Sequence, residues 1–137
     1  MSAASALSVL ERTVIQAGVR TSAARAFASE GLAAFRAGDH AAAATLFGQG
    51  ERAASRTADL LGRAPVTGAE AYGTSNLIIN LSEDAASALR QLTGDLGAGA
   101  MHVERSVNAI DAMLGVARHN VRELRDMARS VRVGAAS

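Results

Sequence analysis

The chain has 137 residues and a formal net charge of +1 at pH 7, so it is long enough for a hydrophobic core and too weakly charged to be drawn onto nucleic acid or an anionic membrane. It contains no cysteine, which excludes disulfides, thiolate metal sites and cysteine nucleophiles. Hydrophobic residues make up 49% of the chain and aromatic residues only 3%. We therefore expect a single helical domain over residues 1–137, with a core of Ala, Leu, Val and Ile.

The basic residues and the N-terminal segment bear on source and location. All 14 basic residues are Arg, which favours a bacterial source with a GC-rich genome; selection for bidentate Arg contacts is the alternative. Residues 1–9 lack the basic and apolar regions of a signal peptide. No stretch reaches the roughly 18 consecutive apolar residues of a transmembrane segment. We expect a cytoplasmic protein, and leaderless export stays open.

A long helix is predicted over residues 2–37. Small and apolar residues recur there at alternating steps of four and three, the spacing of a helical stripe that packs against another helix. The stripe consists of Ala3, Leu7, Leu10, Val14, Ala17, Thr21, Ala24, Ala28, Gly31 and Phe35. Gly18, with Thr21 and Ser22 after it, could end one helix and begin another. Because the stripe continues in phase across this junction, a single helix is favoured.

The first turn is predicted at Gly38 and Asp39. Glycine suits the left-handed position after a helix, and aspartate is a good cap for the next one. A second helix is predicted over residues 39–62. Because the turn is so short, the first two helices should form an antiparallel hairpin.

The segment over residues 63–74 contains the only proline and is predicted to be a loop. A third helix, capped by Thr74 or Ser75, is predicted over residues 74–96. A strand over residues 76–81 is the rejected alternative, because the chain offers no second strand to pair with it.

Glycines at positions 94, 97 and 99 predict a turn before the last helix, because each weakens a helix by about 1 kcal/mol relative to Ala. The last helix is predicted over residues 100–133, with a continuous helix through the glycines as the alternative. It carries the clearest heptad pattern, here called the C-terminal seam. The seam consists of Val103, Val107, Ile110, Leu114, Ala117, Val121, Leu124, Ala128 and Val131. The predicted fold is all-α: an antiparallel four-helix bundle of long helical hairpins with heptad-patterned N- and C-terminal helices.

The lengths of the predicted helices suggest self-association. The terminal helices exceed the inner pair by roughly 15 Å, which would leave part of their stripes uncovered within one chain. A second copy is the simplest cover, so a homo-oligomer is expected. The predicted interface consists of Val107, Ile110, Leu114, Val121 and Leu124, flanked by Arg118, Arg125 and Arg132.

Arginines follow the seam one residue behind it. They are Arg118, Arg122, Arg125, Arg129 and Arg132. They are interpreted first as a solvated flank that suits the C-terminal end of a helix, and second as an ionic edge that pairs with an acidic stripe of another copy. Binding of phosphate or anionic lipid is the third interpretation, which the lack of interleaved aromatic residues disfavours.

No set of residues is typical of a catalytic, cofactor or metal site, so an enzyme is not expected. His40, His102 and His119 are too scattered for metal ligands, and each is interpreted as a surface residue. His119, placed opposite the seam, resembles the phosphoryl acceptor of histidine phosphotransfer domains. Asn120 and Val121 follow it, in place of the Leu-Lys-Gly-type pattern of that family.

Within residues 27–50, Gly31, the Gly38-Asp39 turn, Ala43 and Phe47 fall at the spacings of one tetratricopeptide-type hairpin. The segment resembles a single such repeat, with Ala34 where the repeat has an aromatic residue. The resemblance implies a hairpin that binds a peptide or a protein. In architecture alone, the chain is also similar to the axial and secreted proteins of bacterial export systems, whose long terminal helices pair and polymerise.

The sequence therefore predicts a non-enzymatic bacterial assembly or scaffold protein that self-associates through the seams of its terminal helices. The alternative is an adaptor or secretion-chaperone-like module that holds a protein client at the Phe27–Phe47 hairpin. A third hypothesis is histidine phosphotransfer through His119.

Overall fold

The computed structural model describes residues 2–136, apart from the side chains at positions 4, 7, 132, 133, 135 and 136. Over this part of the chain the protein is all-α, as predicted. Its helices are α1 (Ala3–Arg36), α2 (His40–Gly62), α3 (Ala69–Gly94) and α4 (Ala100–Ala136), and a short 3₁₀ helix, η1 (Leu96–Ala98), precedes α4.

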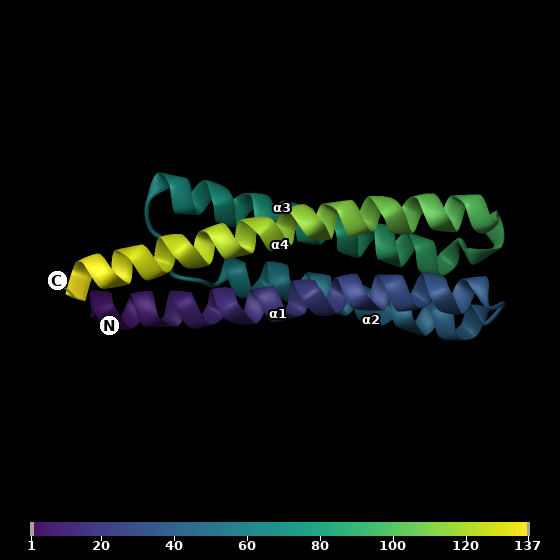
Figure 1. Ribbon diagram of the computed structural model, residues 1–137, viewed down its shortest axis with the longest axis horizontal. Helices are drawn as coiled ribbons and strands as arrows, with labels where there is room; N and C mark the ends of the chain where they lie inside the picture. The colour runs from purple at the N-terminus through teal and green to yellow at the C-terminus, as the bar shows by residue number, and fades with distance from the viewer. Residues whose placement is uncertain (1, 137) are drawn as a thin grey trace.

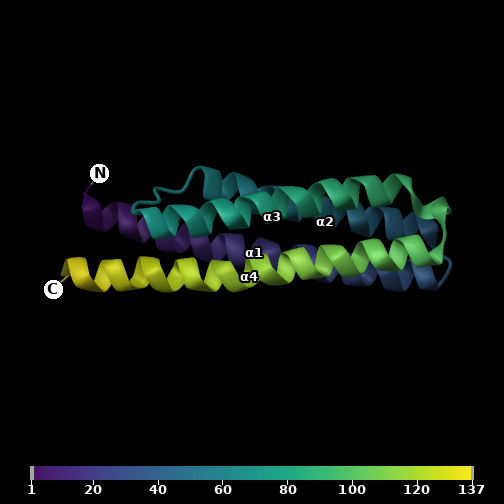
Figure 2. The same ribbon diagram turned by 90° about the horizontal axis from the view of Figure 1, so that it is seen from above.

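The four α-helices form an antiparallel bundle. Each packs against two neighbours: α1 and α3 both contact α2 and α4. The α1–α2 and α3–α4 turns lie at one end of the bundle, while the two termini and the α2–α3 loop lie toward the other (Figures 1 and 2). We call these the turn end and the terminal end. The predicted four-helix bundle is confirmed.

Helix α1 is continuous through Gly18, as the unbroken stripe predicted. Its N-cap is Ser2, whose hydroxyl accepts a hydrogen bond from the Ser5 amide at 3.1 Å. At the turn end, Gly38 has a φ of 83°, and the Asp39 carboxylate accepts from the Ala42 amide at 3.0 Å. The predicted turn therefore forms through the expected left-handed glycine and capping aspartate.

Helix α3 begins at Ala69, five residues before the predicted start, so the loop is shorter than the predicted 63–74. Gly68 occupies the N-cap position with a φ of 92°, a conformation that favours glycine. The Tyr72 amide donates to the Gly68 carbonyl at 2.9 Å. Thr74 and Ser75 therefore lie inside the helix, and the proposed cap at these residues is wrong. Residues 76–81 are helical, which confirms that the strand alternative was rightly rejected.

The core divides into two clusters along the bundle axis. The cluster toward the turn end includes Phe47, Leu89 and Ile110. The smaller cluster toward the terminal end includes Val14, Ile78 and Leu124. Thr21, Thr57 and Ser82 are also fully buried, from three different helices. The Thr21 and Thr57 hydroxyl oxygens lie 3.3 Å apart.

The terminal helices are partly covered at the terminal end. The side chains of Ala64, Val66 and Ala71, from the α2–α3 loop and the first turn of α3, pack against the terminal cluster. The predicted overhang is therefore only partly covered, because α3 begins early and the loop side chains pack on the apolar surface as far as Leu10 and Ala128. Beyond them, Ala3 of the α1 stripe is exposed and Val131 of the C-terminal seam is 54% exposed.

Candidate functional site: a basic groove between α1 and α4

The five apolar residues of the predicted interface lie in the core of the bundle. Val107, Ile110, Leu114, Val121 and Leu124 are 0–4% exposed. They pack against other helices of the same chain. A second copy cannot reach these side chains unless the bundle opens, so any contact between closed bundles must use the outer surfaces of α1 and α4.

One such outer surface is a groove between α1 and α4, here called the basic groove. Its volume is about 400 Å³. It is lined by Val14, Ile15, Gly18, Val19 and Ser22 of α1 and by Arg118, Val121, Arg122 and Arg125 of α4. Of the predicted arginines, Arg118 and Arg125 therefore line this groove, while the side chain of Arg132 lies outside the described part of the chain.

The α1 side of the basic groove is apolar and partly exposed to solvent. Ile15 is 38% exposed and Val19 is 55% exposed, although both are large aliphatic residues. At Gly18 an added Cβ would lie 3.2 Å from Cγ1 of Val121, so the glycine allows α4 to approach α1 closely here. Ile15 and Val19 of α1 thus line one side of the groove, and the arginines of α4 line the other.

Ion pairs between α1 and α4 lie on both sides of the groove. Toward the turn end, Nε of Arg25 donates to Oδ1 of Asp111 at 2.6 Å, and Nη2 donates to Oδ2 at 3.2 Å. Further along, Nε of Arg36 donates to Oε1 of Glu104 at 2.8 Å. Toward the terminal end, Nε of Arg129 lies 3.7 Å from Oε1 of Glu11.

The three arginines of the groove differ from these paired ones. Within the described part of the chain, Arg118, Arg122 and Arg125 form no ion pair or side-chain hydrogen bond. The α1 residues across from them are aliphatic, glycine or serine, so no carboxylate faces them from that helix. The groove therefore offers three arginines without an ion-pair partner beside the apolar side chains of α1.

The Arg25–Asp111 pair shifts the pKa of both of its partners. The hydrogen bond from Arg25 lowers the pKa of Asp111 below its ordinary value, although partial burial opposes the shift. The same hydrogen bond raises the pKa of Arg25. Both side chains are 39% or more exposed, so solvent screens the pair and its contribution to stability is small.

Sequence reasoning identified the arginines but missed the α1 side of the groove. Ile15 and Val19 lie one and two residues behind stripe positions Val14 and Ala17, outside the predicted buried face. Large aliphatic residues off the core stripe were the available signal. Their position opposite Arg118 and Arg125 depends on how α1 packs against α4, which the heptad pattern leaves open.

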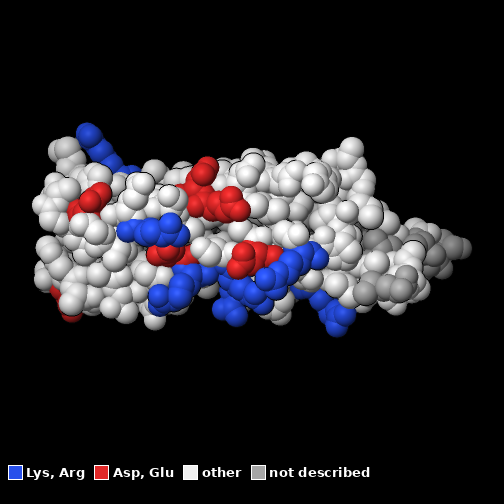
Figure 3. Space-filling model, turned by 180° about the vertical axis from the view of Figure 1, so that it is seen from behind, with Lys and Arg blue, Asp and Glu red and all other residues white. Residues whose placement is uncertain are grey.

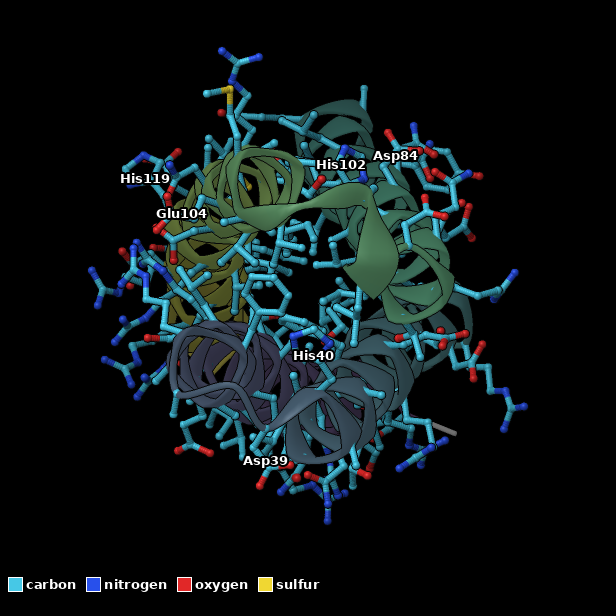
Figure 4. All side chains as sticks on the ribbon, turned by 90° about the vertical axis from the view of Figure 1, so that its right-hand side faces the viewer. Asp39, His40, Asp84, His102, Glu104 and His119 are labelled. Carbon is cyan, nitrogen blue, oxygen red and sulfur yellow. The ribbon has the colours of Figure 1, made fainter. Side chains whose placement is uncertain are left out.

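The histidines are dispersed, as Figure 4 shows from the turn end. The His40 ring stacks on Phe35 with a centroid distance of 4.8 Å. Nε2 of His102 lies 3.8 Å from Oδ2 of Asp95, and Nε2 of His119 lies 3.4 Å from Oε1 of Glu123. No group of three His, Asp or Glu residues among those described lies close enough to hold a metal ion.

The inner side of the Phe27–Phe47 hairpin is buried in the bundle, while its turn and outer side are exposed. The Phe47 ring is fully buried and packs directly over Gly31, where an added Cβ would lie 2.5 Å from Cε1 of Phe47. The outer side of the hairpin has a second hollow, of about 290 Å³. It is lined by Arg20, Phe27, Gln49, Arg52, Ala53 and Arg56.

Over the described residues, no helix combines the length and the apolar character needed to cross a bilayer. Comparison of the chain with protein-family models, curated proteins and solved structures found no match.

Proposed function

We propose that this chain is a non-enzymatic bacterial assembly protein that self-associates through the outer surface of its two long terminal helices, at the basic groove. One observation carries the proposal: three arginines without ion-pair partners in the described chain line a groove whose α1 side carries exposed Ile15 and Val19. Apolar surface flanked by uncompensated charge is typical of a site that a partner covers.

This proposal keeps the self-association predicted from sequence and changes the residues that perform it. The C-terminal seam from Val103 to Ala128 lies in the core of each bundle, and the arginines beside it provide the contact surface. Binding at the groove leaves the bundle closed, so it does not expose the apolar cores. Exposing those cores would cost far more free energy than a surface contact returns.

The test is the solution mass of the purified chain, measured by light scattering across a range of concentrations. We expect a multiple of 14.0 kDa that weakens at high salt, because salt screens exposed charges. Val19→Asp places a carboxylate on the α1 side of the groove and should dissociate the assembly. Val116→Asp makes the same change at an exposed valine of α4 outside the groove lining, and this control should assemble normally. A mass of 14.0 kDa at every concentration would contradict the proposal.

The adaptor hypothesis has one observation in its favour: partly buried Phe27 lies in a hollow rimmed by Arg20, Arg52 and Arg56. Such a hollow suits an acidic peptide with an apolar anchor. Under this hypothesis the chain is a monomer or a dimer, and Phe27→Ser reduces its affinity for an acidic amphipathic peptide in fluorescence anisotropy. The phosphotransfer hypothesis remains a prediction, to be tested by phosphate incorporation that is lost in His119→Ala.

A further inference from the structure

We infer that the surface that enters the basic groove is the outer face of α3 of a second copy, so that the copies associate head to tail. This inference rests on the proposed self-association and names the partner surface. The relevant face of α3, here called the acidic ridge, carries Tyr72, Leu77, Glu83 and Asp84.

The acidic ridge has the chemistry that complements the groove. Tyr72 is 59% exposed and Leu77 is 44% exposed. Glu83 and Asp84 are exposed, and neither forms an ion pair within the described part of the chain. Figure 3, which shows the α2–α3 side of the molecule, has acidic side chains gathered over α3. The ridge is therefore apolar and negative where the groove is apolar and positive.

On each helix, two of these residues project from the same side. Leu77 and Asp84 are seven residues apart, as are Arg118 and Arg125. Seven residues make about two turns of helix, or roughly 10 Å, so each pair projects from one side of its helix. A ridge laid along the groove can place Leu77 near Ile15 and Val19 while its carboxylates lie beside the arginines. This is the helix-in-groove mode of recognition.

The other charged surfaces fit less well. A larger hollow, of about 610 Å³, lies between the start of α3 and α4 and contains Glu70, Glu123 and Asp126. It is concave, and one concave surface cannot fill another. A twofold contact of groove against groove would oppose arginine to arginine, and such like-charge contacts cost several kcal/mol.

The two complementary surfaces lie on different sides of one molecule. In Figure 4, which looks along the bundle, Asp84 points outward from α3 on the side away from His119 of α4. A copy can therefore bind one neighbour at its groove and another at its ridge. Repetition of such a heterologous contact produces a ring if the rotation closes and a filament if it does not.

Charge reversal tests the pairing. The groove variant carries Arg118→Glu and Arg122→Glu, and the ridge variant carries Glu83→Arg and Asp84→Arg. Each variant alone opposes like charges, and we expect its dissociation constant for self-association to rise about 100-fold. Mixing the two variants should restore assembly, because each reversed surface then meets a reversed partner. Restored assembly also shows that both variants are folded.

A matched control reverses two arginines outside the groove, Arg52→Glu and Arg56→Glu, and should leave assembly unchanged. If the wild type assembles and the groove variant dissociates but the ridge variant assembles normally, the head-to-tail inference is overturned while self-association stands. The inference also fails if the mixture of the two variants stays dissociated. A wild type that is monomeric at every concentration overturns the proposed function itself.

Discussion

The two halves of the bundle are built differently. Toward the turn end, Phe47, Leu89 and Ile110 belong to the larger core cluster, and Arg25–Asp111 and Arg36–Glu104 join α1 to α4. Toward the terminal end the core is smaller, and the loop side chains help to cover it. The unpaired arginines and exposed aliphatic residues of the basic groove lie in this second half. The comparison suggests that the turn half provides stability and that the terminal half provides the surface for association.

Truncation of a large core residue should have the largest effect on stability. The loss of unfolding free energy should be greater in the turn half than in the terminal half. Phe47→Ala removes a fully buried ring and is expected to cost about 4 kcal/mol of unfolding free energy. Leu124→Ala, in the terminal cluster, is expected to cost about 2 kcal/mol, because the smaller core there can relax more. Urea unfolding followed by circular dichroism measures both values, and a larger cost for Leu124→Ala would reverse the ranking of the halves.

Two glycines of α1 offer a sharper comparison of the halves. Gly31→Ala places a Cβ 2.5 Å from the Phe47 ring, whereas Gly18→Ala places one 3.2 Å from Val121. We expect Gly31→Ala to destabilise by about 2 kcal/mol through overpacking. For Gly18→Ala a smaller strain offsets the helix-propensity gain of about 1 kcal/mol, so stability should barely change. Thermal unfolding of the two variants tests this, and equal effects would show that the turn half is not the more tightly packed.

For one of the buried hydroxyls in the middle of the bundle, we expect its removal to increase the free energy of unfolding. The Ser82 hydroxyl is fully buried and has no hydrogen-bond partner among the described residues. Ser82→Ala removes this unsatisfied group and should stabilise the fold by about 1 kcal/mol. By contrast, the Thr21 hydroxyl donates to the Ala17 carbonyl at 2.9 Å, so Thr21→Val should destabilise. Chemical denaturation measures both, and a loss of stability in Ser82→Ala would show that its hydroxyl is satisfied.

The smallest effect concerns the Arg25–Asp111 pair. Asp111→Asn should cost about 0.5 kcal/mol at neutral pH, because both partners are substantially exposed. Since the pKa of Asp111 is lowered in the folded chain, the folded chain binds fewer protons than the unfolded chain near pH 4. The contribution of the Arg25–Asp111 pair to the unfolding free energy is therefore complete above the ordinary pKa of aspartate. It is lost as the pH falls through the lowered pKa of Asp111.

The measurement is the difference in unfolding free energy between the wild type and Asp111→Asn from pH 7 downward. We expect this difference to shrink toward zero in acid. A difference that grows as the pH falls would contradict the assigned role of the pair.

The sequence was sufficient to predict the bundle because its signals are local or periodic. Heptad spacing identified the buried faces of α1 and α4, and Gly38 and Asp39 identified the first turn. The start of α3 was missed because Gly68 and Ala69 begin the helix without a side-chain cap, so the usual signal was absent. That single difference also shortened the uncovered overhang, since Ala71 packs against the terminal core while Val131 is 54% exposed.

The candidate site was only half predictable. The arginine row of α4 is periodic and was visible in the sequence. Which arginines form ion pairs between α1 and α4 could not be predicted. Arg129 reaches Glu11, and Arg25 finds Asp111 from 86 residues away along the chain, whereas Arg118 and Arg122 face aliphatic and small residues. Which arginines are neutralised depends on the rotation and register of α1 against α4, and heptad spacing fixes neither.

The most direct test of the central claim is the solution mass of the wild type and of the double variant Arg118→Glu and Arg122→Glu, by light scattering at low and high salt. We expect the wild type to exceed 14.0 kDa at low salt and to dissociate at high salt, and the variant to be monomeric with unchanged helicity. A variant that assembles as the wild type does would contradict the assignment of association to the basic groove.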